Sequence, residues 1–151
     1  MVPNIIAFHG QKRSGKNEST RIMISITGGR EYSFARRIKN ILSQVYGLTS
    51  EETDGVYKER PFEYPIAIDD ALSSLSALVE LDLQPRGLVA RTPRELMQFF
   101  GTEYVRSIQD DYWVAYLMAL ITLEREAQQL HGTAYITDCR FENERRTRGV
   151  A

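Results

Sequence analysis

The stretch from Gly10 to Asn17 has the residue types and the spacing of a phosphate-binding loop. Gly10 and Gly15 let the backbone approach a phosphate without a clashing Cβ, and Lys16 brings a positive charge to the β- and γ-phosphates of a nucleotide. Asn17 stands where most such loops have the serine or threonine that helps to hold Mg²⁺. Its amide oxygen is a weaker substitute ligand, so either the metal is held mainly by phosphates, water and a distant carboxylate, or metal binding is impaired. The expected chemistry is the binding of a nucleoside triphosphate.

Two elements must flank such a loop, because the phosphate has to meet backbone N–H groups at the start of a helix that follows a strand. The residues Ile5–Phe8 form a short apolar run, which is typical of a buried parallel strand. From Lys16 onward the apolar spacing is helical until Gly28 and Gly29, which predict the end of that helix. The sequence therefore supplies the context that phosphate binding requires.

Further elements are predicted from apolar periodicity and capping residues. Thr92 at the N-cap, Pro93 at the first helical position and Glu95, placed to close a capping box, predict a helix that Gly101 interrupts. The other expected elements are a strand at 32–35, helices at 36–46, about 69–79 and about 112–130, a strand at 134–137 and a last helix at 141–148. The span 48–91 is otherwise irregular, and we interpret it as a mobile insertion.

Length and composition indicate the general class of protein. The chain has 151 residues, 42% of them hydrophobic, so it can bury one core as a single domain over residues 1–151. Alternating strands and helices favour an α/β fold, a parallel sheet flanked by helices with right-handed crossovers. The chain has no run of about 18 apolar residues and no basic leader, which predicts a cytoplasmic protein without a membrane segment.

The charge balance and the few Cys and His residues exclude several other classes. One cysteine, Cys139, excludes an internal disulfide, and two distant histidines argue against structural zinc and receive no role. With 19 basic against 20 acidic side chains there is no excess charge for nucleic-acid phosphates, although this balance does not exclude a local basic groove. We therefore expect a small-molecule ligand.

Four sequence blocks occur in an order that is characteristic of one family. They are GQKRSGKN, SFARRIK, TPRELMQFFGTE with DYWV, and ITDCRFENE. Together they resemble the deoxynucleoside monophosphate kinases of tailed bacteriophages, nearly end to end except for about 48–91. The resemblance implies a P-loop kinase core with a mostly helical substrate-binding insertion, located in the host cytoplasm if the chain is phage-encoded. It also implies ATP and Mg²⁺ as cofactors and transfer of the γ-phosphoryl group to a deoxynucleoside monophosphate, which gives the diphosphate.

The resemblance implies a donor site around the ATP phosphates. Its residues are Gly10, Lys12, Arg13, Ser14, Gly15, Lys16 and Asn17, of which Arg13 is also implied to touch the transferring group. Asp138, at the end of the last strand, is implied to orient Mg²⁺ together with Asn17, and Arg140 to act from the same edge on the transferring group and the substrate. Asn143 and Glu144 complete the family pattern or stabilise the last helix, and Cys139 is interpreted as a small core residue.

The resemblance implies a second, substrate-binding set of residues. Lys39 and Arg94 fall where such enzymes hold the phosphate of the monophosphate, and Gln98 is suited to read a base edge. Alternatively, Lys39 and Arg94 are solvated helix charges. Trp113 either packs against the base or belongs to a helix core. This set fits phosphoryl transfer, which needs in-line positioning and charge cancellation but no covalent nucleophile.

The chain departs from the family at its end. The family continues past Gly149 with a strand, an arginine-proline turn and structure that closes over ATP, whereas this chain ends at Ala151. A sheet edge left open in this way is usually covered, which predicts a homo-oligomer. Three functions stay open: an active kinase, a shortened relative that binds nucleotide without turnover, and an interaction protein that reuses the fold. The base preference is not readable from the sequence.

Overall fold

The computed structural model describes residues 5–7, 22, 24, 26, 28–127, 130 and 132–136. It divides into two compact units, one made of Met1–Arg36 with Asp111–Ala151 and the other of Arg37–Asp110. The expectation of a single domain stays a prediction beside these two units. Among the described residues, no helix has the length and apolar character needed to cross a membrane.

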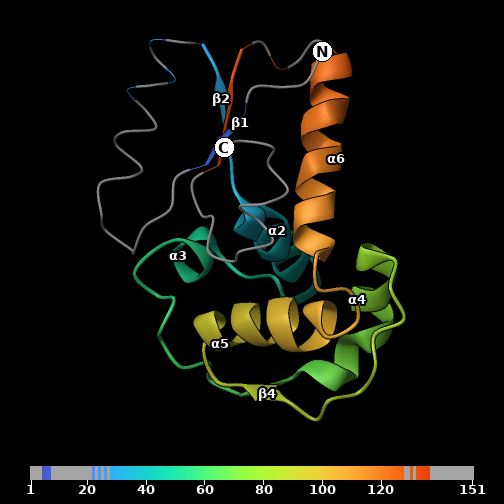
Figure 1. The fold of residues 1–151 in the computed structure, drawn as a ribbon. Coiled ribbons are helices and arrows are strands. Elements are labelled where there is room, and N and C mark those ends of the chain that lie inside the picture. The colour runs from blue at the N-terminus through green and yellow to red at the C-terminus, as the bar shows by residue number, and fades with distance from the viewer. Residues whose placement is uncertain are drawn as a thin grey trace. The chain divides into compact units, whose positions relative to one another are not determined.

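The first unit contains a three-stranded parallel sheet (Figure 1). Its strands are β1 (Ile5–Ala7), β2 (Arg30–Tyr32) and β5 (Ala134–Ile136), in the order β1-β5-β2. The last strand in sequence therefore lies between the two earlier ones, and Ala7 and Tyr32 are both in register with Ile136. The predicted α/β class, a parallel sheet flanked by helices, is confirmed.

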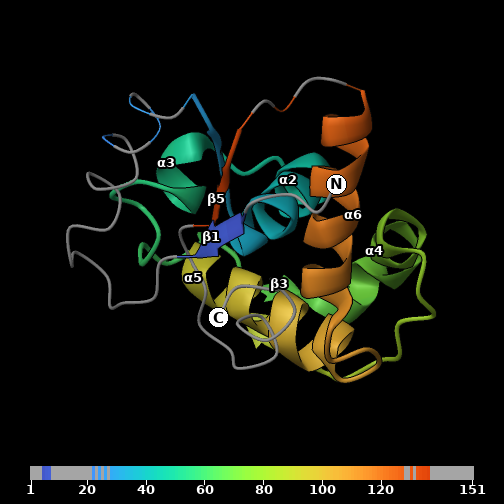
Figure 2. The same cartoon turned by 45° about the horizontal axis from the view of Figure 1, so that its top comes forward.

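The core of this unit lies between the sheet and the long helix α6 (Tyr112–Glu126), which runs beside the strands in Figures 1 and 2. Helical spacing brings three α6 residues to the buried face, where they meet Phe34 and residues of all three strands. The buried cluster consists of Ile5, Tyr32, Phe34, Val114, Leu117, Ile121, Leu130, Ala134 and Ile136. The helix is shorter than predicted, because it ends at Glu126. After this end, the N–H of Leu130 donates a hydrogen bond to the Glu124 carbonyl at 3.2 Å.

Packing also corrects the predicted strand at 32–35. The strand ends at Tyr32, and helix α2 (Phe34–Tyr46) begins two residues later. Phe34 has the β-propensity of a strand residue, but as the first residue of α2 it is only 6% exposed within the core cluster. Burial of its ring outweighs local propensity, so α2 begins two residues earlier than the predicted Arg36.

Two glycines precede β2 for different physical reasons. Ile22, Ile24 and Ile26 are helical, and Gly28 ends this helix with φ of 72° and an N–H bonded to the Ile24 carbonyl at 2.8 Å, as predicted. Gly29 has no space for a side chain. A Cβ there would overlap the Thr133 carbonyl oxygen and lie 2.6 Å from the Tyr135 ring. The close approach of this segment to β5 therefore requires glycine.

The span 48–91 contains more regular structure than predicted. Its elements are α3 (Ser50–Thr53), β3 (Ile66–Ala67), the 3₁₀-helix η1 (Ile68–Ala71), α4 (Leu72–Val79) and β4 (Val89–Ala90). The expected helix at about 69–79 is confirmed as η1 and α4 together. The antiparallel pair β3–β4, with Ile66 opposite Ala90, has no counterpart in the sequence-based prediction.

Helix α5 (Pro93–Gln98) begins as predicted, with the Thr92 hydroxyl accepting a hydrogen bond from the Glu95 N–H at 3.1 Å. The Glu95 carboxylate, however, accepts from the N–H of Arg91 at 2.8 Å rather than closing a box onto Thr92. The predicted break at Gly101 is wrong. The chain continues as the π-helix η2 (Phe99–Arg106), in which Gly101 is buried with Phe100 and Tyr104, so packing of this face outweighs the helix cost of glycine.

Candidate functional site

The predicted donor residues lie outside the part of the chain that the structure describes. These residues are Gly10, Lys12, Arg13, Ser14, Gly15, Lys16, Asn17, Asp138 and Arg140. The structure does describe the two strands that precede them in the sequence, β1 and β5. Because β1 and β5 are parallel neighbours with Ala7 opposite Ile136, the chain leaves both strands at the same edge of the sheet.

Both predicted donor segments follow one of these two strands within a few residues of sequence. The phosphate-binding loop starts at Gly10, three residues after Ala7, and Asp138 follows Ile136 by two residues. Ligand sites of open α/β sheets lie at the carboxyl ends of their strands. The observed register places the last residues of the two strands, Ala7 and Ile136, opposite each other at this edge.

Of the predicted substrate residues, Arg94 and Gln98 share α5. They are four residues apart and so lie on one helix face, with Gln98 exposed and Arg94 half-buried. The Arg94 N–H donates to the Lys58 carbonyl oxygen at 2.9 Å. Its Nε lies 3.0 Å from Glu59 Oε1, which makes an ion pair although the N–H is not directed for a hydrogen bond.

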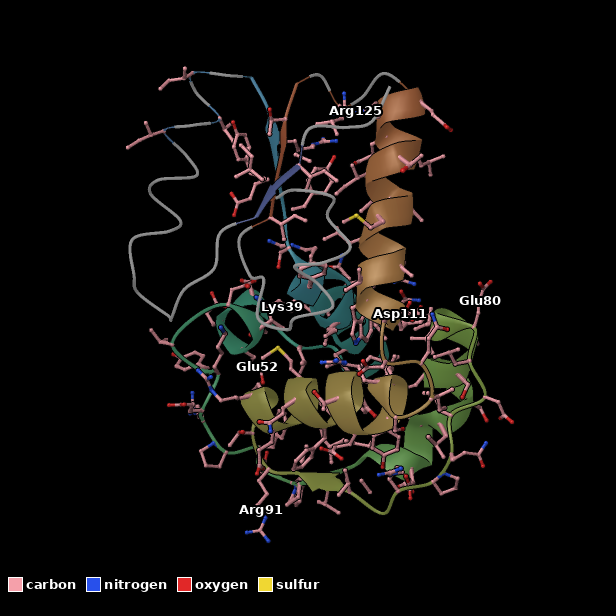
Figure 3. All side chains as sticks on the ribbon, viewed as in Figure 1. Lys39, Glu52, Glu80, Arg91, Asp111 and Arg125 are labelled. Carbon is pink, nitrogen blue, oxygen red and sulfur yellow. The ribbon has the colours of Figure 1, made fainter. Side chains whose placement is uncertain are left out.

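Lys39 comes from α2 and lies near α3 in Figure 3. Its Nζ forms an ion pair of 2.5 Å with Oδ1 of Asp54, the C-cap residue of α3. The Lys39 side chain is only 18% exposed, so this pair is better shielded from water than the pair of Arg94, whose side chain is 42% exposed. The alternative of a solvated helix charge therefore fits Lys39 less well than Arg94, for which it stays open.

Trp113 belongs to the other compact unit, on α6, and is 5% exposed. Its ring meets that of Tyr112 edge-on, with centroids 4.7 Å apart and an interplanar angle of 87°. This burial agrees with the helix-core interpretation of Trp113, and its contact with a base stays a prediction.

Sequence reasoning missed the carboxylates that pair with the predicted cations. Asp54 and Glu59 lie in the irregular span, five residues apart, and each forms an ion pair with one of the two cations. The only signal in the sequence is the alternation of acidic and basic residues in EETDGVYKER. Charges of this kind are usually solvated, so the signal could not identify partners.

The same segment borders an open hollow of about 420 Å³. It is lined by Glu52, Tyr57, Arg60, Pro61, Phe62 and Glu63. The Arg60 guanidinium lies over the Tyr57 ring, 4.9 Å from its centroid. The N–H of Phe62 donates to the Arg91 carbonyl at 2.8 Å, which fixes this wall of the hollow to the chain just before α5.

In the unit Arg37–Asp110, the carboxylate of Asp69 stabilises the fold. Asp69 accepts hydrogen bonds from the Tyr104 hydroxyl at 2.6 Å and from the N–H groups of Arg86 and Gly87 at 3.0 and 2.8 Å. These bonds, that of Tyr104 first, lower the pKa of Asp69. Burial, followed by the bond to Asp69, raises the pKa of Tyr104 to about 12. Asp69 therefore anchors the turn before β4 to η2, and we give it no part in the candidate site.

Comparisons with protein-family models and with curated proteins find no match to this chain. Within the described residues, no group of three or more His, Cys, Asp or Glu side chains could hold a metal ion. The predicted metal ligands, Asn17 and Asp138, lie outside those residues. The described residues thus hold two separate sets of candidates: the ends of β1 and β5 in the first unit, and the cations Lys39 and Arg94 in the second.

Proposed function

We propose that this chain is an ATP-dependent deoxynucleoside monophosphate kinase. The observation that carries the proposal is the parallel register of β1 and β5, with Ala7 opposite Ile136. Because of this register, β1 and β5 end at one sheet edge, and we expect the loop with Lys16 and the segment with Asp138, which follow these strands in the sequence, to begin there. A phosphate-binding loop beside a strand-end carboxylate is what nucleotide phosphoryl transfer needs.

In the proposed reaction, an oxygen of the monophosphate attacks the γ-phosphorus of ATP. The bond from that phosphorus to the bridging oxygen breaks, and ADP leaves. Lys16 and Arg13 cancel charge on the donor phosphates, while Lys39 and Arg94 hold the acceptor phosphate. These residues act by position and charge, since the reaction requires no covalent intermediate on the protein.

The residues proposed to hold Mg²⁺ would be Asn17, through its amide oxygen, and Asp138, through its carboxylate. Oxygen ligands of this kind suit Mg²⁺, and the ion would supply positive charge that stabilises the donor phosphates during transfer. The proposal accordingly expects turnover to depend on Mg²⁺.

A coupled assay of ADP release tests the proposal across the four deoxynucleoside monophosphates, with and without Mg²⁺. We expect ADP release to require a monophosphate and Mg²⁺, and to vanish in Lys16→Ala. ATP binding without turnover would instead favour a shortened nucleotide-binding relative. If neither ATP nor any monophosphate changed the melting temperature, an interaction protein would be favoured, because a specific ligand stabilises the state that it binds.

A further inference from the structure

Both proposed phosphate-binding cations are already neutralised by one short segment of the chain. Lys39 Nζ lies 2.5 Å from Asp54 Oδ1, and Arg94 Nε lies 3.0 Å from Glu59 Oε1. The two cations come from different helices, α2 and α5, whereas the two carboxylates are five residues apart. We name Asp54–Glu59 the acidic segment.

Backbone hydrogen bonds hold the acidic segment in this position. The N–H of Tyr57 donates to the Glu51 carbonyl at 3.0 Å, so the segment folds back on α3. At its other end the Lys58 carbonyl accepts the N–H of Arg94 at 2.9 Å. The segment is thereby attached both to α3 and to the start of α5, and each attachment presents one carboxylate to one cation.

The charges of these four side chains cancel in pairs, two positive against two negative. A phosphate monoester carries about −1.5 to −2 at pH 7, which matches the combined charge of the two carboxylates. A phosphate diester carries a single negative charge and can replace only one of them. The charge balance of the pairs thus favours monoesters.

We propose that Asp54 and Glu59 compete with the substrate phosphate for Lys39 and Arg94, and so set both the affinity and the selectivity for a phosphate monoester. This inference rests on the proposed function, because it takes the two cations as the acceptor-phosphate site. The carboxylates are displaced when the monophosphate binds and return when it leaves. They are specificity-determining residues and take no part in the chemical step.

The exposure of the pairs makes such an exchange feasible. The side chains of Asp54 and Glu59 are 44% and 75% exposed, so a displaced carboxylate passes into water at little cost. The Lys39 side chain, at 18% exposed, is the better shielded of the two cations. Removal of its partner should therefore have the larger effect on ligand affinity.

Isothermal titration calorimetry of the full chain with each deoxynucleoside monophosphate tests the inference. We expect Asp54→Asn and Glu59→Gln to bind the monophosphate roughly two- to fivefold more tightly, because each loses one exposed ion pair. Glu63→Gln is the matched control: it removes one negative charge close in sequence but leaves both pairs intact. The affinity of Glu63→Gln for the monophosphate should equal that of the parent chain.

A second arm measures selectivity, using the 3′,5′-cyclic phosphate diester of the same nucleoside as the competing ligand. In the parent chain the monoester should bind more tightly, since the single charge of the diester matches only one of the two carboxylates. Equal affinities of the two ligands for the parent chain would overturn the selectivity part of the inference. Melting temperatures show whether each variant is folded. If Asp54→Asn is unfolded, Glu59→Gln tests the inference alone, because its side chain is exposed and its loss should not disturb folding.

The outcomes separate the inference from the proposed function. If the parent chain binds a monophosphate and the pair-breaking variants bind it no better, the inference is overturned while the kinase proposal stands. An equal gain in Glu63→Gln overturns it too, because bulk charge then explains the effect. If neither the parent chain nor any variant binds a monophosphate, the proposed function is wrong and the inference fails with it.

Discussion

Tyr46 carries a buried hydroxyl that has no hydrogen-bond partner among the described residues. A buried polar group without a partner costs free energy, so its removal should relieve that cost. We expect Tyr46→Phe to raise the free energy of unfolding by about 1 kcal/mol in urea denaturation. The control is Tyr64→Phe at a side chain that is 77% exposed, where no change is expected. A clear loss of stability in Tyr46→Phe would show that the hydroxyl has a partner.

The raised pKa values of three tyrosines lead us to expect a lower free energy of unfolding at alkaline pH. Burial is the first cause that raises the pKa of Tyr32, Tyr46 and Tyr104 to about 12, from 10.0. Glu124 adds to the shift at Tyr32, whose hydroxyl donates to it at 2.5 Å. Above pH 10.0 the unfolded chain loses protons that the folded chain keeps until about pH 12, so the free energy of unfolding falls as pH rises.

Urea unfolding at steps from about pH 9 to about pH 12 measures this decline. Tyr46→Phe should show a shallower decline than the parent chain, because it lacks one of the three shifted phenols. Equal slopes for the two proteins would remove Tyr46 from this explanation.

Arg94 is the residue whose proposed role is easiest to separate from folding. Loss of a cation that holds the acceptor phosphate should raise the KM for the monophosphate, by about tenfold, and leave the KM for ATP unchanged. Steady-state kinetics of Arg94→Ala measure both constants. Arg91→Ala is the control, since this exposed side chain projects away from the helices in Figure 3. A monophosphate KM in Arg94→Ala that equals the parent value would remove Arg94 from the substrate site.

At the scale of elements, the approach of the residues before β2 to β5 depends on Gly29. Its Cβ would overlap the Thr133 carbonyl and the Tyr135 ring, and backbone atoms cannot move aside cheaply. We expect Gly29→Ala to lower the free energy of unfolding by about 2 to 3 kcal/mol. Gly47→Ala, where φ is 70° and a Cβ would meet open space, should cost only about 1 kcal/mol. Equal costs in thermal denaturation would contradict this packing argument.

Local signals predicted some elements well and failed at others. The helix end at Gly28 and the N-cap at Thr92 depend on a few neighbouring residues, and both are confirmed. The start of α2 and the continuation of the helix through Gly101 depend on which side chains become buried, and a single sequence does not give that information. The two-residue strands β3 and β4 depend on pairing across about twenty residues, which has no local signal.

At the scale of the whole molecule, the sheet class could be predicted because the alternation of strands and helices favours parallel pairing. The position of β5 between β1 and β2 could not, since the order of strands is set by packing rather than by sequence order. For the candidate site, Lys39 and Arg94 could be named from the sequence blocks. Their carboxylate partners Asp54 and Glu59 could not, because long-range ion pairs leave no periodic pattern.

The central proposal concerns the path of one phosphoryl group. The most direct measurement uses ATP that carries a radioactive γ-phosphate, incubates it with the chain, Mg²⁺ and each deoxynucleoside monophosphate in turn, and separates the products by chromatography. The proposal predicts that label appears in a deoxynucleoside diphosphate, and that Lys16→Ala, with an unchanged melting temperature, transfers none. Label that stays in ATP, or appears only as inorganic phosphate, with every monophosphate would contradict it.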